Sequence, residues 1–217
     1  MSVITIERKI IEKNDIIAQQ NREMFKKKNL FTLNIVSSPG SGKTSIIERT
    51  IYHTKGRFKI AVIEGDVQTS LDAERVERYG VPVVQIVTQG SCHLEAGLVR
   101  DAFRQFEENK FNVLFIENVG NLVCPAGYDL GEDMKVVIVS TTEGDDKPLK
   151  YPAMFRNASV LIINKMDLIP YVNCSLATLQ NNALLINPSL KIFKTSCTTD
   201  EGISEWCRWI QSNLKSE

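Results

Sequence analysis

Short apolar runs alternate along most of the chain with longer segments whose apolar residues recur at helical spacing. One helical segment starts near residue 43, and the others span residues 70–79, 93–108, 176–186 and 203–214. Several apolar runs carry almost no polar residue, as expected for strands that are covered on both faces. The alternation predicts an α/β fold with a mostly parallel sheet and helices on both faces. The predicted strands are 31–36, 59–63, 83–86, 113–116, 136–140, 160–163 and 190–194.

The first segment differs from this pattern because it is long and mostly polar. Residues 9–28 place Ile10, Ile17, Met24 and Phe25 at helical spacing, which predicts an amphipathic N-terminal helix. The basic residues Lys26–Lys28 complement a helix C-terminus, and a basic binding patch is the alternative. We see no repeat, low-complexity tract or linker. The expected organisation is therefore one domain over 1–217 with an N-terminal helix at about 9–28.

Composition narrows the class of protein. Apolar residues make up 43% and charged residues 24%, and 26 basic residues balance 26 acidic ones. A net charge of zero argues against nucleic acid as a partner, which needs clustered positive charge. No apolar run approaches the ~18 residues of a membrane span, and the N-terminus lacks the apolar core of a signal peptide. We expect a cytoplasmic protein without a membrane partner.

Residues 37–44 (Ser-Ser-Pro-Gly-Ser-Gly-Lys-Thr) resemble the phosphate-binding P-loop, G-x-x-x-x-G-K-[ST], between a predicted strand and a predicted helix. Ser37 stands where the pattern has its first glycine. In such a loop backbone N–H groups surround phosphate oxygens, Lys43 contacts the β and γ phosphates, and Thr44 binds Mg²⁺. A glycine-rich turn without function is the alternative. The expected nucleotide-binding residues here are Ser38, Pro39, Gly40, Ser41, Gly42, Lys43, Thr44 and Ser45.

Carboxylates at strand ends are candidates for the magnesium side of phosphoryl transfer. Asp66 follows the second predicted strand, and Glu117 ends the strand at 113–116 in a Walker-B-like position. Gly120 would let a backbone N–H approach the γ-phosphate. Asp72 could orient water or metal, or it could be an ordinary acid at the start of a helix. Glu117 could likewise be a polar residue that only ends a strand. The expected magnesium ligands are Thr44, Asp66 and Glu117, and the expected catalytic residues are Lys43, Asp66, Asp72, Glu117 and Gly120.

Residues 164–167 (Asn-Lys-Met-Asp) follow a predicted strand and match the N-K-x-D pattern of GTPases. The Asp167 carboxylate can accept hydrogen bonds from guanine N1–H and the exocyclic amine, a donor pair that adenine lacks. Asn164 would hold the loop and contact the base, and the Lys165 stem would pack on the ring. Ser196 and Cys197 follow the last strand, where GTPases place a backbone N–H for guanine O6.

The five cysteines are odd in number, and none forms a C-x-x-C pair, which argues against structural disulfides. Cys174, Cys197 and Cys207 are most simply small thiols in or near the core. Cys92 with its neighbour His93 precedes a predicted helix, a position that lowers a thiol pKa and favours metal binding. From composition alone, Cys92, His93 and the distant Cys124 are more simply structural. One chain would also supply only three ligands, whereas two copies would complete a tetrahedral site.

Taken together, these motifs resemble the hydrogenase maturation factor HypB family of nickel-insertion GTPases, over nearly the whole chain from Asn29. The resemblance implies a GTPase that dimerises with nucleotide, binds nickel or zinc at the interface through Cys92, His93 and Cys124, and works with a HypA-type nickel chaperone on the [NiFe]-hydrogenase large subunit. A cysteine-rich N-terminal nickel motif and a His-rich tract are absent, so nickel storage is not expected. The most specific blocks are residues 37–44, 64–66, 92–96, 117–125, 143–152 and 164–167.

Three alternatives stay open at this point. A urease-type nickel GTPase, the UreG family, shares the nucleotide motifs, but its Cys-Pro-His metal motif is missing here. A regulatory GTP switch would contain inert cysteines, and a metal carrier could bind nucleotide without hydrolysing it. No arginine is placed recognisably as a finger in cis, so hydrolysis should be slow. Because Cys124 follows Glu117 and Gly120 closely, we expect the nucleotide state to change the metal site.

Overall fold

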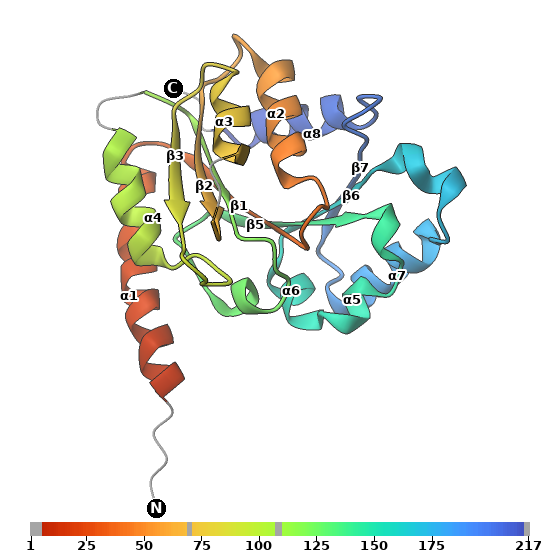
Figure 1. Ribbon diagram of the computed structural model, residues 1–217, viewed down its shortest axis with the longest axis horizontal. Helices are drawn as coiled ribbons and strands as arrows, with labels where there is room; N and C mark the ends of the chain where they lie inside the picture. The colour runs from red at the N-terminus through yellow and green to blue at the C-terminus, as the bar shows by residue number, and fades with distance from the viewer. Residues whose placement is uncertain (1–5, 69–70, 107–109, 215–217) are drawn as a thin grey trace, which may run out of the picture.

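The computed structural model describes residues 6–68, 71–106 and 110–214, and these form a seven-stranded sheet in which every pair of neighbouring strands is parallel (Figure 1). The strand order is β3-β2-β4-β1-β5-β6-β7. The predicted α/β class and the predicted strands are confirmed, with ends that differ by a few residues. The strands are β1 (Phe31–Ser37), β2 (Ile60–Asp66), β3 (Val83–Val87), β4 (Val113–Glu117), β5 (Met134–Ser140), β6 (Val160–Asn164) and β7 (Lys191–Lys194).

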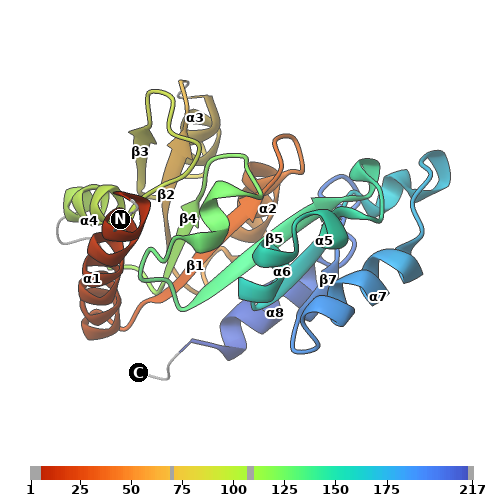
Figure 2. The ribbon, with the colours of Figure 1, turned by 90° about the horizontal axis from the view of Figure 1, so that it is seen from below.

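Helices cover both faces of the sheet, as predicted. On one face lie α2 (Lys43–Thr54), α3 (Leu71–Glu77) and α8 (Ile203–Ser212). On the other face α1 (Ile6–Lys27) and α4 (Ala96–Phe103) cover the β2–β4 side, as Figure 2 shows. The rest of that face is covered by α6 (Pro152–Asn157) and α7 (Leu176–Ile186), with the short α5 (Lys147–Lys150) beside α7.

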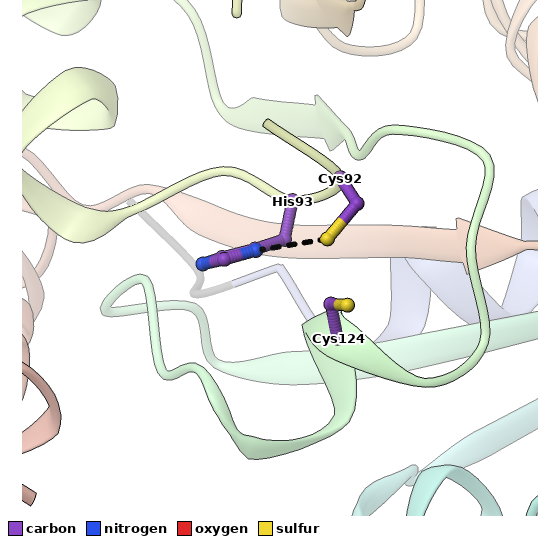
Figure 3. A group of neighbouring side chains, drawn as sticks. All are labelled: Cys92, His93 and Cys124. Atoms are coloured by element: carbon purple, nitrogen blue, oxygen red, sulfur yellow. Dashed lines mark hydrogen bonds between the residues drawn. The ribbon is translucent and has the colours of Figure 1, made fainter. Parts of the chain in front are cut away.

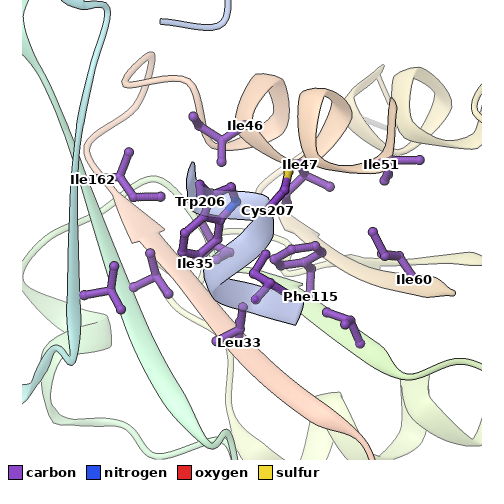
Figure 4. Close-up of a cluster of buried hydrophobic side chains, with 14 of the residues drawn as sticks. Leu33, Ile35, Ile46, Ile47, Ile51, Ile60, Phe115, Ile162, Trp206 and Cys207 are labelled. Carbon is purple, nitrogen blue, oxygen red and sulfur yellow. The ribbon is translucent and has the colours of Figure 1, made fainter. Parts of the chain in front are cut away.

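Each strand contributes alternate residues to the two faces, which explains the continuously apolar runs. In β1, Leu33 and Ile35 face α2 and α8, whereas Val36 joins the cluster under α6 and α7. Figure 4 shows the first cluster, with Trp206 of α8 fully buried at its centre. The Trp206 indole N–H donates to the Thr50 hydroxyl at 2.9 Å, so its polar atom is satisfied inside the core. The three apolar clusters share one sheet, which supports a single-domain organisation.

Several helix ends differ from the prediction. Helix α4 begins at Ala96 instead of residue 93, because a side-chain turn holds the preceding loop: the Thr88 hydroxyl donates to Ser91 O, and the Ser91 hydroxyl donates to His93 O. Helix α3 ends at Glu77, and α8 ends at Ser212. Helix α1 begins at residue 6, three residues earlier than expected. Residues 70 and 107–108 of the predicted helices lie outside the described residues.

Helices α5 and α6 were missed by the sequence analysis. Pro148 and Pro152 stand in their first turns, where the missing N–H of proline removes no intrahelical hydrogen bond. Over the residues that the structure describes, no helix is both long and apolar enough to cross a membrane.

The strand order brings the loops that carry the sequence motifs together at the carboxyl ends of the strands. The chain leaves β1 toward β2, on one side of β1 in the sheet, whereas it leaves the neighbouring β5 toward β6, on the other side. Ligands of open parallel sheets bind at such a reversal, outside the carboxyl ends of the strands. The P-loop follows β1, and the segment after β4 begins at Asn118 beside it.

Candidate nucleotide and metal sites

The P-loop lies between β1 and α2 and depends on two close backbone approaches. Gly42 has a φ of 99°, and a Cβ there would lie 2.4 Å from Nδ2 of Asn164. At Gly120, after β4, a Cβ would lie 3.0 Å from Cα of Pro39. Side chains at these positions would therefore push apart the P-loop and the two loops that flank it. The structure brings Gly120 to the P-loop, and its approach to a γ-phosphate stays a prediction.

Polar side chains from neighbouring strands hold the P-loop in place. The Ser41 hydroxyl lies 2.8 Å from Ser38 O and 2.6 Å from Oε1 of Glu143, which follows β5. Asn164 Nδ2 donates to Ser41 O at 2.9 Å, and Lys165 Nζ donates to Gly40 O at 2.7 Å. The sequence analysis missed Glu143. The sequence signal that could have identified Glu143 is the S-x-x-E spacing of a capping box, which Ser140 and Glu143 form in the structure.

A carboxylate cluster lies beside Thr44, at the start of α2. Carboxylate oxygens of Glu64, Asp72 and Glu117 lie within 4.8 Å of one another, and the Thr44 hydroxyl donates to Glu117 Oε1 at 2.8 Å. Among the described residues, Oε2 of Glu64 and Oε2 of Glu117 are buried without a hydrogen-bond partner. Buried oxygens without partners are costly, and a hard divalent cation such as Mg²⁺ binds this kind of oxygen set. The residues therefore fit a magnesium ion.

Glu64 occupies the place that the sequence analysis gave to Asp66. Glu64 of β2 and Glu117 of β4 are opposite each other in the parallel register. The Asp66 carboxylate instead accepts hydrogen bonds from the backbone N–H groups of Val67 and Gln68, and it is not part of the 4.8 Å cluster. The sequence shows acidic residues near the ends of β2 and β4. It does not show which residue of β2 lies opposite Glu117, because that depends on how the two strands pair in the sheet.

Asp72 does join the cluster, and Arg75 holds it there. Arg75 Nη1 donates to Asp72 Oδ1 at 2.8 Å, and Arg75 Nη2 donates to Oε2 of Glu48 at 2.6 Å. Arg75 Nη2 also donates to the Ser45 hydroxyl at 3.2 Å. Arg75 thus connects α3 to α2 beside the P-loop. The Asp72–Arg75 pair is an ordinary i,i+3 helix pair, so the position of Asp72 in the carboxylate cluster is the observation that supports a site role.

Burial changes the proton affinity of the two buried glutamates. Burial, followed by the nearby charge of Glu117, raises the pKa of Glu64 to about 8. Burial also raises the pKa of Glu117 to about 7, although Lys43 and the Thr44 hydroxyl oppose the shift. Without a cation, both carboxyls therefore tend to keep a proton near neutral pH. Cation binding must displace these protons.

These shifts predict a pH-dependent stability for the metal-free protein. Because the folded pKa values exceed the unfolded value, the unfolded chain loses its protons first, and stability falls as pH rises from about 4.5 to 8. Glu64→Gln removes one such carboxyl. In excess chelator we expect the variant to be more stable than the wild type by roughly 1–3 kcal/mol at pH 8, but not at pH 5.

Urea unfolding at both pH values measures this difference. Glu77→Gln, at an exposed position of α3, is the matched control and should show no pH-dependent gain. An equal effect of Glu64→Gln at pH 5 and pH 8 would contradict the raised pKa.

The 164–167 loop lies beside the P-loop, at the end of β6. The Ser196 hydroxyl donates to Asp167 Oδ1 at 2.6 Å and accepts from the N–H groups of Thr198 and Thr199. The Asp167 carboxylate is thereby oriented before any base arrives. Asn164 is buried, and its Oδ1 accepts from the Thr195 hydroxyl at 3.2 Å. Asn164 thus connects the 164–167 loop to the P-loop and to Thr195.

The other cysteines behave as the sequence analysis expected. Cys197 Sγ lies 3.7 Å from Asn164 Oδ1, and burial raises the pKa of its thiol to about 11. Burial also raises the pKa of the Cys207 thiol to about 11 in the core under α8. Cys174 is half-buried, with a thiol pKa that burial raises as well. Among the described residues, none of these three thiols belongs to a cluster of possible metal donors.

Cys92, His93 and Cys124 come together within one chain (Figure 3). Their ligand atoms lie within 4.8 Å of one another, and Cys92 Sγ is 3.6 Å from His93 Nδ1. Cys92 and His93 belong to the loop before α4, and Cys124 begins the 3-10 helix Cys124–Gly127. All three side chains are half-buried. The two loops thus form a three-donor site of two sulfurs and one imidazole, a set that suits Zn²⁺ or Ni²⁺.

The protonation of this trio differs from the sequence expectation. The hydrogen bond that Cys92 shares with Cys124, together with burial, raises the pKa of the Cys92 thiol. The expected helix N-terminus is too far away to lower it, because α4 starts only at Ala96. Burial lowers the pKa of His93, whose ring packs against the Tyr128 ring at a centroid distance of 3.9 Å. The lowered pKa favours the neutral imidazole, which is the form that binds metals, and the raised pKa of Cys92 favours a thiol whose proton metal binding must release.

Asn118 connects the carboxylate cluster to the metal loops. It follows Glu117 directly, but its side chain contacts the opposite face of the sheet. Asn118 Oδ1 accepts from the backbone N–H of Leu94 at 3.1 Å, and its Nδ2 donates to Asn34 Oδ1 at 3.2 Å. Further along, Asn121 Nδ2 donates to Cys92 O at 3.4 Å. The segment 117–124 thus contacts both sites, and the sequence analysis did not identify Asn118 or Asn121.

Comparison with known proteins agrees with this geometry. Residues 31–194 match the family model "CobW/HypB/UreG, nucleotide-binding domain". The hydrogenase maturation factor HypB of Rhizobium leguminosarum bv. viciae is 48% identical over 209 residues, which cover 96% of this chain and 70% of that protein. The same factor of Escherichia coli (strain K12) is 44% identical over 210 residues, covering 97% and 72%.

Solved structures show the same relationship. The structure of HypB from Helicobacter pylori in complex with nickel superposes with a TM-score of 0.88 at 39% identity, covering 94% of this chain and 98% of that chain. HypB from Archaeoglobus fulgidus gives the same TM-score and identity, covering 94% and 100%. The signal recognition particle receptor FtsY of Elizabethkingia anophelis, at 14% identity and a TM-score of 0.57, shares the fold alone. The chain therefore belongs to the CobW/HypB/UreG family of nucleotide-binding proteins and, within it, to the hydrogenase maturation factors HypB.

Proposed function

We propose that this protein binds and hydrolyses GTP and uses its nucleotide state to capture and release nickel during maturation of a [NiFe]-hydrogenase. One observation supports this most: the segment that begins with Glu117 and approaches the P-loop at Gly120 also carries the metal ligand Cys124. A loop that is ordered by the γ-phosphate and released after hydrolysis is a common GTPase switch. Here the same loop would move a sulfur ligand.

In the nucleotide site, each residue has a role that its position supports. Backbone N–H groups of 40–43 and the Lys43 ammonium would bind the phosphates, and Asp167 would select guanine. Thr44, Glu64, Asp72 and Glu117 would hold Mg²⁺, which supplies charge neutralisation at the phosphates. The Arg75 guanidinium is engaged by Asp72 and Glu48, so it does not act as a finger. We therefore expect slow hydrolysis in the absence of a partner.

In the metal site, one chain supplies three donors and leaves at least one coordination position for another ligand. An open position suits a cargo that must be handed on, whereas a closed four-ligand site suits a structural metal. A second copy of the chain could fill the position, in keeping with a nucleotide- and metal-linked homodimer. Zinc fits the same donors, and a HypA-type nickel chaperone and the hydrogenase large subunit are the proposed partners. We place the protein in the cytoplasm, where thiols remain reduced.

A second target is favoured by one comparison. A relative from Helicobacter hepaticus, 42% identical over 206 residues, is described as a "Hydrogenase/urease maturation factor HypB". Delivery to a urease as well as a hydrogenase is thus a candidate function for this chain. The nucleotide and metal chemistry would be the same for both targets.

Lys43→Ala tests the hydrolytic part of the proposal. Loss of the ammonium that faces the β and γ phosphates should lower GTP turnover by at least ~10²–10³-fold, the effect of removing one donor to developing charge. Phosphate release from the wild type and the variant, with Mg²⁺ and without nickel, measures it. Lys55→Ala, an exposed lysine just after α2, is the control. Turnover by Lys43→Ala at the wild-type rate would refute a GTPase built on this loop.

A further inference from the structure

Helix α1 carries two asparagines that are buried although the helix lies on the surface of the domain. Asn14 is 4% exposed and Asn21 is fully buried. They are seven residues apart, which is two helical turns, so both lie on the same side of α1. Figures 1 and 2 show that this helix runs beside α4. Buried amides need partners, and the partners of these two define what α1 contacts.

Both asparagines bridge the same two segments. Asn14 Oδ1 accepts from the backbone N–H of Ala96, and Asn14 Nδ2 donates to Asp129 O, each at 2.8 Å. Asn21 Nδ2 donates to Ala96 O at 2.8 Å and to Leu130 O at 3.0 Å. Each amide thus joins the first residue of α4 to the chain at 129–130. Four hydrogen bonds, three of them buried and one partly buried, hold these two segments at a fixed separation.

A surface ion pair and a close backbone contact reinforce the bridge. Arg22 Nη2 lies 2.8 Å from each carboxylate oxygen of Asp129. At Gly131 a Cβ would lie 2.6 Å from Cβ of Asn21. The chain at 129–131 therefore fits tightly against α1. Such two-oxygen pairing with arginine adds directional restraint as well as attraction.

The two bridged segments are the ones that carry the metal donors. Ala96 follows His93 by three residues, and Asp129 follows the 3-10 helix that starts at Cys124. Tyr128, next to Asp129, packs its ring on His93. No element other than these two loops supplies a donor to the trio within the described residues. The distance between the loops therefore sets the distance between the sulfurs.

We infer that α1 is a clamp on the metal site, with Asn14 and Asn21 as positioning residues that set the spacing of Cys92 and His93 relative to Cys124. The inference rests on the proposed nickel-binding function and adds the element that controls its affinity. Among the described residues, the recorded hydrogen bonds of Asn14, Asn21 and Arg22 reach no P-loop or 164–167 residue. Loosening α1 thus changes metal binding without changing the nucleotide site.

Asn21→Leu, which keeps the branching of the side chain but replaces the amide by larger methyl groups and removes the two donated bonds, tests the clamp. Nickel binding to the full chain is measured by competition with a chromophoric chelator, together with the sulfur-to-nickel charge-transfer absorption. We expect a loss of affinity of roughly 10–100-fold, the usual effect of removing support from metal ligands, and an altered absorption spectrum. GTP turnover without nickel should stay within about twofold of the wild type, because P-loop contacts are unchanged.

Two further variants separate clamping from general stability. Phe25→Leu weakens the packing of α1 on α4, where Phe25 contacts Phe103 at a centroid distance of 4.9 Å, but it keeps all four amide bonds. It should leave nickel affinity unchanged. Arg22→Gln removes the ion pair with Asp129 and an exposed hydrogen bond to Gln19. It therefore leaves the folded core intact and should lower affinity in the same direction by a smaller factor.

The outcomes are distinct. In one outcome, the wild type binds nickel and the Asn21→Leu and Arg22→Gln variants show the same affinity and the same spectrum. That result overturns the clamp but leaves the proposed function standing. Equal losses in Asn21→Leu and Phe25→Leu also overturn it, since packing alone would then explain the effect. A wild type that binds no nickel overturns the proposed function and the clamp with it.

Discussion

Asp167→Asn should reduce the affinity for GTP by about 10⁴-fold and create a preference for xanthosine triphosphate. Asp167 is the carboxylate expected to pair with guanine N1–H and the exocyclic amine, and a site built to hydrogen-bond a substrate group rejects a mismatched partner by such factors. An asparagine amide would place an N–H against the guanine amine. Xanthine has a carbonyl oxygen there, which that N–H can bind.

The surroundings of Asp167 make the substitution a clean test. The Ser196 hydroxyl donates to Asp167 Oδ1 at 2.6 Å, and an asparagine Oδ1 can accept the same bond, so the loop should retain its shape. Competition binding with GTP, ATP and xanthosine triphosphate measures the exchange. Recovery of binding with the xanthine nucleotide shows that the variant is folded. An undiminished preference for GTP would mean that another group selects the base.

Cys124→Ser should lower nickel affinity by roughly 100–1,000-fold, the share of one ligand in the binding free energy of a thiolate–imidazole site. The hydroxyl keeps the size of the thiol but is a poor ligand for this metal. The same variant should keep GTP binding, since its side chain faces Cys92 rather than the P-loop. Equilibrium dialysis with Ni²⁺ at a fixed nucleotide state measures the loss.

Cys174→Ser provides the matched control for that experiment. Cys174 is also half-buried, but it is not among the residues of the donor cluster. It should bind nickel like the wild type. If Cys124→Ser and Cys174→Ser were both without effect, the thiols would be structural, and the protein would be a GTP switch without cargo.

Local patterns in the sequence were sufficient for the sheet and the phosphate site. The five inner strands bury both faces and so show as apolar runs. The conformation of the P-loop depends on glycines that are close together in the sequence. Lys43, Thr44, Glu117 and Gly120 could therefore be placed from the sequence. Helices α5 and α6 were not predicted, because the prolines in their first turns are also typical of loops.

Contacts across the sheet could not be predicted in the same way. Glu64 was passed over for Asp66 because its role depends on the register between β2 and β4. Asn118 and Asn21 look like ordinary polar residues until their partners, far away in the sequence, are known. The meeting of Cys92 with Cys124 was expected only from the family resemblance. From composition alone, scattered cysteines favoured a structural role.

The central claim is that the segment 117–124 couples the γ-phosphate to the metal donors. Titration of the wild type with Ni²⁺, once with GDP and once with a non-hydrolysable GTP analogue, tests it most directly, with oligomeric state followed in parallel. We predict dissociation constants that differ by roughly 5–150-fold between the two nucleotides, the usual range of coupling between linked sites. Equal nickel affinities in the two states would contradict the account.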